Sequence, residues 1–406
     1  MIPEQQQSTA TVGQVEDRLL TSNFVFATLA NFLMSSCMMM LTATLPVYVI
    51  SLGGSRADAG LVIGAHALTS VLFRPFLGGL TDAWRRRPVI MTGITFHGLA
   101  SVIYLLAGSI PLLIFGRLVQ GLGLGSYSTA ASVYVADIAP LKRRAEAVGL
   151  FSAAQAMGLV AGPVFGFMII EWTGFQHLFY FTGGLAVIAL CFSIFTREHP
   201  KPLKTARRPW SFRTGIVAFD ALPMAWMALC MGTGHGSISA FISIFAQSRG
   251  LQNPGFYFMV QAIALLVARA FTGRLADRAG RTVVIVPGVI LMVLGLAMLP
   301  LSHGFKDFVF SAALFGIGFG SAQPATMALL IDRIRPEQRG VAIGTYFMGF
   351  DVGFIIGTIL MGAVSQQWGL GVMWLMASAW TLLSLAGIVV ERRHPALSLP
   401  GRSPDL

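Results

Sequence analysis

The sequence predicts an all-α membrane protein with twelve transmembrane helices in two pseudo-symmetric six-helix bundles. Two observations predict this fold: apolar runs long enough to cross a bilayer recur along the chain, and the second half repeats the first. The 406 residues are 55% hydrophobic and only 11% charged, with a mean hydropathy of +0.72. Soluble domains carry about 25% charged residues, so composition alone indicates the membrane class.

The apolar runs are close to the roughly 20 residues that a helix needs to span a bilayer. In the first half we expect helices over residues 22–51, 58–81, 88–107, 110–136, 145–170 and 177–196. In the second half we expect them over residues 218–247, 254–276, 282–301, 307–331, 339–366 and 371–390. The resulting division is an N-terminal tail (1–20), a first bundle (21–196), a linker (197–217), a second bundle (218–391) and a C-terminal tail (392–406).

Two loop segments 195 residues apart carry the clearest internal repeat. The first, Arg74–Ile90, reads RPFLGGLTDAWRRRPVI, and the second, Arg269–Ile285, reads RAFTGRLADRAGRTVVI. At the same offset GLGLGS at 121–126 matches GIGFGS at 316–321. A repeat of this length indicates that the chain is two copies of one plan.

Basic residues gather in alternate loops, and this asymmetry predicts orientation by the positive-inside rule. With an inside N-terminus, the outside loops hold only Arg56, Arg249 and Lys306. We therefore expect a multi-pass protein of the plasma membrane, in bacteria the inner membrane, with both termini cytoplasmic. The net charge of +11 is then dispersed over short inside loops and does not indicate a nucleic-acid partner.

Several other classes find no support in the sequence. Cys37, Cys191 and Cys230 lie inside apolar runs and have no disulfide or metal-site spacing, so we expect no metal and no cofactor. The polar N-terminus lacks the basic segment and cleavage site of a signal peptide. The glycine-rich GLGLGS and GIGFGS lie inside apolar helices and do not follow a strand, which excludes the dinucleotide-binding interpretation.

The segment GRLADRAGR resembles the loop signature Gly-x-Leu-Ala-Asp-Arg-x-Gly-Arg of the major facilitator superfamily. The first copy departs at Ala83 and Arg85, and the resemblance extends over about residues 20–395. It implies a cytoplasmic latch that joins the two halves in the outward-open state. The alternative is a solvated loop that only obeys the positive-inside rule. The latch candidates are Gly78, Asp82, Arg86, Asp137, Arg143, Gly273, Asp277, Arg278, Gly280, Arg281, Asp332 and Arg339.

Two further motifs carry the resemblance. Arg117, with Gln120 and Gly121, matches the family's Arg-x-x-Gln-Gly motif of helix four, which implies proton transfer; a snorkelling arginine is the alternative. In helix five, GLVAGPVFG resembles the antiporter motif typical of exporters, with Phe167 in place of the last glycine. Its members here are Gly158, Gly162, Pro163 and Gly166, and small-residue packing is the simpler interpretation.

Lone polar residues at mid-membrane complete the candidate site. Asp351 is the only acid far from both membrane faces, where burial favours a neutral carboxyl and a functional role is the usual interpretation. The proton-coupling candidates are Asp351, Arg117, His66 and His235, although each lone histidine also fits a hydrogen-bonded packing role. The substrate-cavity candidates are Asn31, Met38, Gln120, Tyr127, Met231, Gln261 and Gln323.

Taken with the resemblance, these residues predict a secondary transporter and not an enzyme. We expect a monomer that exports a small amphipathic organic molecule in exchange for protons, by alternating access between the two halves. An uptake symporter or facilitator is the alternative within transport. A membrane enzyme or a receptor is a more distant one, because no nucleophile or acid–base cluster is apparent at the membrane interface.

Overall fold

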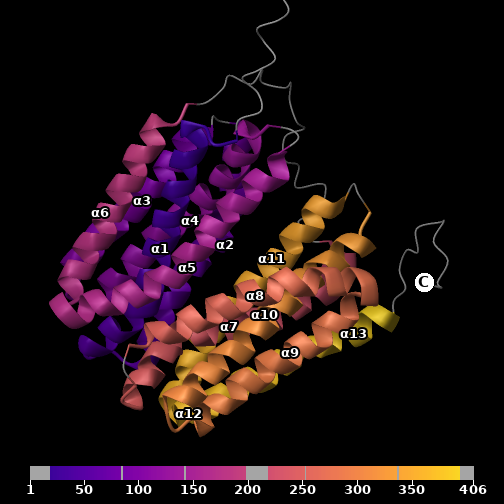
Figure 1. The fold of residues 1–406 in the computed structure, drawn as a ribbon. Helices are drawn as coiled ribbons and strands as arrows, with labels where there is room; N and C mark the ends of the chain where they lie inside the picture. Colours follow the sequence, from indigo (N-terminus) through magenta and orange to yellow (C-terminus); the bar gives the residue numbers. More distant parts are fainter. Residues whose placement is uncertain are drawn as a thin grey trace, which may run out of the picture.

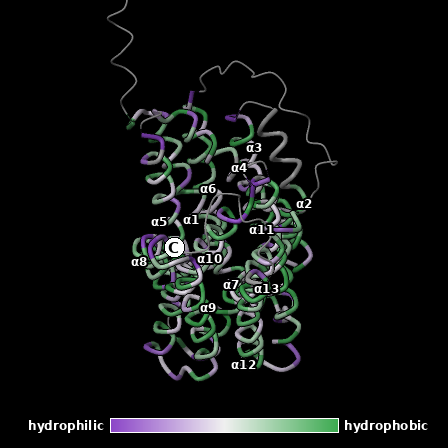
Figure 2. Tube along the Cα trace, turned by 90° about the vertical axis from the view of Figure 1, so that its right-hand side faces the viewer, coloured by the Kyte–Doolittle hydropathy of each residue, from purple (hydrophilic) through white to green (hydrophobic). Residues whose placement is uncertain are grey.

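A computed structural model of the chain describes residues 19–83, 86–140, 143–197, 218–251, 253–335 and 338–393. Throughout these ranges the regular structure is helical, without a strand. Within them, ten stretches are long and apolar enough to cross a membrane. Figure 2 shows hydrophobic colour along the bodies of the helices and hydrophilic colour mainly near their ends. An all-α multi-pass membrane fold is thus confirmed.

Six helices of the first half form one bundle, drawn from indigo to magenta in Figure 1. Their bounds are α1 Ser22–Ser51, α2 Arg56–Ala83, α3 Arg86–Leu106, α4 Ile110–Ile138, α5 Arg144–Thr173 and α6 Phe175–Phe195. Each falls within a few residues of its predicted range.

The second half forms a second bundle beside the first, drawn from orange to yellow (Figure 1). Its helices are α7 Leu222–Ser248, α8 Gly255–Ala279, α9 Arg281–Met298, α10 Phe305–Arg333, α11 Arg339–Ile355, α12 Met361–Leu382 and α13 Ser384–Arg393. Short 3-10 helices, Phe219–Ala221 and Leu299–Leu301, adjoin α7 and α9. A π-helical turn, Ile356–Leu360, joins α11 to α12.

The count of twelve spans stays a prediction. The ten apolar stretches leave out α2, and the last of them, Val341–Glu391, runs through 51 residues. Gly369 breaks that stretch: its φ of 85° and ψ of 165° are not helical, and glycine has no Cβ to resist a positive φ. The chain therefore turns at Gly369, between the two helices predicted as 339–366 and 371–390.

The internal repeat is also a repeat of contacts. A Cβ added at Gly121 of α4 would lie 2.5 Å from the carbonyl oxygen of His66 in α2. The corresponding Cβ at Gly316 of α10 would lie 2.4 Å from the carbonyl oxygen of Gln261 in α8. Only glycine permits such close approach of two helix backbones, so the paired glycines place α4 on α2 and α10 on α8 in the same way.

The helix ends beside the arginine-rich loops, at 83–86, 138–144, 279–281 and 333–339, define a basic end; the other end is called the opposite end. The hydrogen bonds that join the two halves within the described ranges lie toward the opposite end. The Arg56 amide donates to Gln366 Oε1 at 3.1 Å, and Arg56 Nη1 to the Ser365 carbonyl at 3.0 Å. Ser243 Oγ donates to the Ala43 carbonyl at 2.7 Å.

Glycines tighten the same contact. An added Cβ at Gly60 would lie 2.2 Å from the Thr358 carbonyl oxygen in the π-helical turn. One at Gly255, the first residue of α8, would lie 2.7 Å from the carbonyl oxygen of Pro163 in α5. These close approaches hold the two bundles together at the opposite end.

Candidate functional site

At the basic end the repeat produces the same ion pair in each half. Arg86 Nε at the start of α3 lies 3.8 Å from Asp137 Oδ2 at the end of α4. Its repeat mate, Arg281 at the start of α9, donates to Asp332 Oδ2 at 3.0 Å and also pairs with Asp277. In both halves the latch arginine therefore binds acids of its own bundle. Every ion pair resolved in the described ranges has both partners in one half.

Two further latch candidates, Arg143 and Asp332, have resolved charged partners. Arg143 donates to both carboxylate oxygens of Glu146, at 2.8 and 2.7 Å, in the first turn of α5. Asp332 pairs with Arg281, whereas Arg339 is exposed and has no resolved polar contact in the described part of the chain. Glu146 lies three residues after Arg143, and this local spacing was a signal in the sequence. The Arg281–Asp332 pairing had no such signal, because the packing of two helices brings these groups together.

The remaining latch candidates have no resolved ion pair in the described part of the chain. Gly280 separates α8 from α9 with a φ of 97°, a conformation that favours glycine. Gly273 has open space around it, and the side chain of Arg278 is exposed. The side chain of Asp82 and the surroundings of Gly78 lie outside the part of the chain that the structure describes.

We expect Asp332→Asn to slow transport by about tenfold or more, because Arg281 loses a charged partner and the balance between the two states of the transporter shifts. The protein should still insert, since a partly exposed ion pair contributes at most about 1 kcal/mol to stability. Initial rates in proteoliposomes measure the effect. Glu171→Gln, an equal charge change at the exposed opposite end of α5, is the control. Equal rates in both variants would contradict the latch assignment.

The helix-five glycines pack against α1. An added Cβ at Gly158 would lie 2.8 Å from the Phe32 carbonyl oxygen, and one at Gly162 would lie 2.5 Å from that of Ser36. At Gly166 the nearest atom is Met40 Cγ, at 2.7 Å. Pro163 lies between these glycines, and its carbonyl oxygen faces Gly255 of α8 in the other half. The motif thus connects close packing inside one bundle with the contact between bundles.

We expect Gly162→Ala to lower the melting temperature, because its methyl group meets the α1 backbone. Gly149→Ala in the same helix is the control, since nothing lies within 4 Å of its added Cβ. Alanine there should be neutral or stabilising by about 0.5–1 kcal/mol, the usual gain over glycine inside a helix. The bulkier Gly162→Leu should reduce transport more than it reduces the yield of monodisperse protein. Aggregation of Gly162→Leu would favour a role in packing alone.

Arg117 is completely buried in the first bundle, about 10 Å from the opposite end of α4 at 1.5 Å per residue. Its Nη1 donates to Gln120 Oε1 at 2.8 Å, and the Tyr104 hydroxyl donates to the same oxygen at 2.9 Å. This leaves the Gln120 amide nitrogen facing His97 Nε2, at 3.2 Å. Since the amide nitrogen can only donate, His97 accepts at Nε2 and is neutral in this arrangement.

Arg117 and Asp351 are not brought together. Within the described ranges, α4 packs on α1, α2, α3 and α5, whereas α11 packs on α2, α7 and α10. The Nε and Nη2 atoms of Arg117 are buried without a hydrogen-bond partner among the described residues. A direct interaction between these two proton-coupling candidates therefore has no support in this conformation.

His235 lies in an aromatic cluster of the second bundle, and Asp351 adjoins one member of this cluster in the chain. The His235 ring stacks on Phe319 of α10, with centroids 4.9 Å apart and an interplanar angle of 4°. The rings of Phe350 and Phe354 of α11 are also close, with centroids 6.1 and 6.0 Å from that of His235. Asp351 follows Phe350 directly and is half-buried. The Asp351 carboxyl group is thus carried near the middle of the helices, one residue along α11 from a ring of this cluster and on an adjacent side of the helix.

Several substrate-cavity candidates have packing roles in the structure. Asn31 Nδ2 donates to the Phe151 carbonyl at 3.0 Å, and Asn31 Oδ1 lies 3.5 Å from the Tyr127 hydroxyl. Met231 is fully buried in the apolar core, and Met38 is half-buried. His66 and Gln261 are buried at the helix crossings described above, and Gln120 belongs to the Arg117 network.

Gln323 differs from these candidates. It is half-buried on α10 and accepts a hydrogen bond from Arg269 Nη2 of α8 at 3.1 Å. Arg269 was visible in the sequence only as a member of the repeat. Its position well inside an apolar helix was a signal that could have placed it among the functional candidates.

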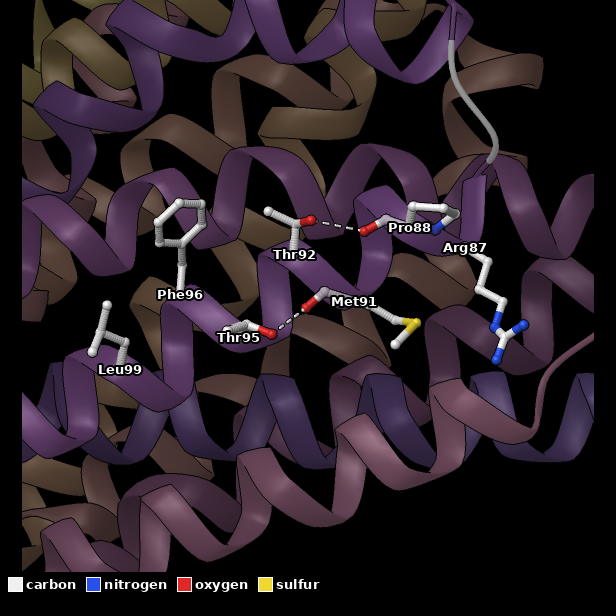
Figure 3. A pocket seen from close by; sticks show the side chains of 7 residues that line it. All are labelled: Arg87, Pro88, Met91, Thr92, Thr95, Phe96 and Leu99. Carbon is white, nitrogen blue, oxygen red and sulfur yellow. Dashed lines mark hydrogen bonds between the residues drawn. The ribbon is translucent and has the colours of Figure 1, made fainter.

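One surface pocket of about 630 Å³ lies elsewhere, along a single face of α3 (Figure 3). Its hydroxyl groups are already hydrogen-bonded within α3: the Thr92 and Thr95 hydroxyls donate to the Pro88 and Met91 carbonyls, both at 2.9 Å. Arg87 donates to the Ser193 carbonyl of α6 at 3.3 Å. Arg87 is thus tied to the α6 backbone, and the rest of the lining is apolar apart from the two hydrogen-bonded threonines, so this pocket is not a candidate site.

The fold and the paired motifs define a membrane transporter with two related halves. The profile of the Major Facilitator Superfamily matches residues 27–305 and 254–405, so the chain belongs to this superfamily. The quinolone resistance protein NorA of Staphylococcus aureus is 23% identical, over 87% of this chain and 92% of its own. The multidrug resistance protein MdtG of Escherichia coli is 24% identical, over 93% of this chain and 96% of its own.

Solved structures share the fold. A bacterial homologue of the human lysosomal transporter Spinster, in an inward-facing and unoccupied conformation, superposes with a TM-score of 0.78. It is 14% identical, over 91% of this chain and 96% of its own. A D-xylose–proton symporter superposes with a TM-score of 0.73 at 15% identity, over 91% and 96% of the two chains. Membership of the superfamily, shown by the profile match, makes the protein a transporter and not an enzyme.

Proposed function

We propose that the protein exports small amphipathic organic molecules in exchange for protons, by alternating access between its two bundles. The observation that carries the proposal is the half-buried Asp351 carboxyl at mid-helix, one residue along α11 from Phe350 of the His235 aromatic cluster. Exchange with protons needs a group that is charged in one step and neutral in another. The aromatic faces around His235 supply apolar surface at the same level for an amphipathic substrate.

The direction of transport rests on separate grounds. The helix-five motif resembles that of exporters, and the relatives NorA and MdtG are named for drug resistance. In this proposal the basic end faces the cytoplasm, as the positive-inside rule expects. The contacts between Gly60 and Thr358 and between Gly255 and Pro163 then close the outer side, so the conformation is open toward the cytoplasm.

Uptake by symport is the second candidate, because the D-xylose–proton symporter has the same fold. Everted membrane vesicles separate the two. An exporter should move a fluorescent drug into everted vesicles only when a pH gradient, acid inside, is imposed, and collapse of the gradient should release it. A symporter should instead drive uptake in right-side-out vesicles. Flux without any dependence on the gradient would reject proton coupling in either direction.

A further inference from the structure

Arg269 is an exposed cation deep within a membrane-spanning helix. It lies ten residues before Ala279, the last residue of α8, and so about 15 Å from the basic end at 1.5 Å per residue. The helix is one of the ten stretches long and apolar enough to cross a membrane. A charged side chain at such a depth is costly in lipid and is expected to face the protein interior or water.

The neighbours of Arg269 leave its charge unneutralised. Its Nη2 donates to Gln323 Oε1 at 3.1 Å, and Gln323 lies ten residues before the end of α10, at the same level. That neutral amide is its one resolved polar contact in the described part of the chain. Arg281 and Arg333, in contrast, have carboxylate partners. A guanidinium has five N–H donors, so Gln323 orients the group and leaves most of its donors for a ligand.

The helical register directs Arg269 toward the other bundle. Gly255 marks the face of α8 that meets Pro163 and Val164 of α5 at the opposite end. Arg269 follows 14 residues later, just under four turns at 3.6 residues per turn, and so lies within about 40° of that face. On α5, Met157 precedes Val164 by about two turns and is 63% exposed. An exposed cation and an exposed methionine thus lie on the facing sides of the two bundles.

We infer that Arg269, oriented by Gln323, binds the anionic group of an amphipathic organic anion whose apolar part lies against Met157. The planar guanidinium matches a carboxylate or sulfonate with two parallel hydrogen bonds, and methionine adapts to varied apolar shapes. The inference rests on the proposed function and narrows its substrate class to organic anions. An anionic phospholipid offers the same chemistry, but its headgroup belongs at the membrane surface and not about 15 Å below the helix end.

Thermal unfolding of the full-length protein in phosphatidylcholine nanodiscs tests this binding. The probes are 1-naphthoate and 2-naphthalenesulfonate, with the neutral 1-naphthamide as the matched comparison. The acids should raise the melting temperature in a dose-dependent way, and the amide should not. Arg269→Gln should weaken the apparent affinity for the acids about tenfold or more. Arg269→Lys keeps the charge but not the planar fork, so it should weaken that affinity less. Lys306→Gln, an equal charge change at the opposite end of α10, should bind as the wild type does.

Three results would overturn the inference. The first is an equal shift of the melting temperature by the acids and the amide, and the second is no shift with either acid. The third is undiminished acid binding by an Arg269→Gln protein whose ligand-free melting temperature matches that of the wild type. In nanodiscs that contain phosphatidylglycerol, loss of the acid effect would identify a lipid headgroup as the ligand and would also overturn it. The assay needs no pH gradient, so its failure is distinct from a failure of proton-coupled export.

Discussion

The Asp351→Asn variant should lose all transport driven by a pH gradient while downhill exchange of substrate continues. Asparagine keeps the size and most of the hydrogen bonds of aspartate, but it cannot take up and release a proton. Asp351 is half-buried and lies twelve residues into α11, about 18 Å from the basic end. A carboxyl group at that depth is the strongest proton-site candidate in the second bundle.

Proteoliposomes measure both modes with one preparation. An imposed pH gradient reports the driven mode, and exchange of labelled for unlabelled substrate reports the downhill mode. Asp220→Asn is the matched control, because Asp220 is exposed at the basic end, just before α7. Retention of gradient-driven flux by Asp351→Asn would exclude this carboxyl and leave His235 as the next candidate. Loss of both modes would indicate damage to the transport path itself.

The sequence predicts the helices well because the bilayer constrains their length. The predicted range 22–51 coincides with α1, and the repeat at Gly121 and Gly316 recurs as matching contacts on α2 and α8. The break at Gly369 falls in the gap between the predicted ranges 339–366 and 371–390. The π-helical turn Ile356–Leu360, in contrast, could not be predicted. Hydropathy measures the apolar character of a run and carries no information on how the backbone turns within it.

For the site, motifs identify residues but not their partners. The latch candidates included Arg281 and Asp332, yet their pairing follows from the packing of α9 on α10. The helix-four motif singled out Arg117 and Gln120, but Tyr104 and His97 complete the network from α3. A pairing between segments far apart in the sequence depends on helix rotation, and one sequence without its homologues does not determine that rotation.

A disulfide across the two bundles at the opposite end should stop transport reversibly. Thr358 Oγ1 lies 2.7 Å from the position of a Cβ added at Gly64, so the sulfur of a cysteine at 358 would be close to bonding distance of one at 64. We expect the Gly64→Cys/Thr358→Cys variant, in a background without the exposed Cys191, to form this bond on mild oxidation. Alternating access requires the opposite end to open, and a covalent bond there prevents it.

Transport in proteoliposomes is measured before oxidation, after oxidation and after reduction. The rate before oxidation is then the reference for each preparation. The control is Gly98→Cys/Ala186→Cys, which joins α3 to α6 inside the first bundle, where an added Cβ at Gly98 lies 3.6 Å from Ala186 Cβ. This bond leaves the bundles free to move as rigid bodies, so oxidation should not change the transport rate of the control variant. If the oxidised Gly64→Cys/Thr358→Cys protein still transports at its reduced rate, the opposite end is not a gate, and the two bundles do not alternate as proposed.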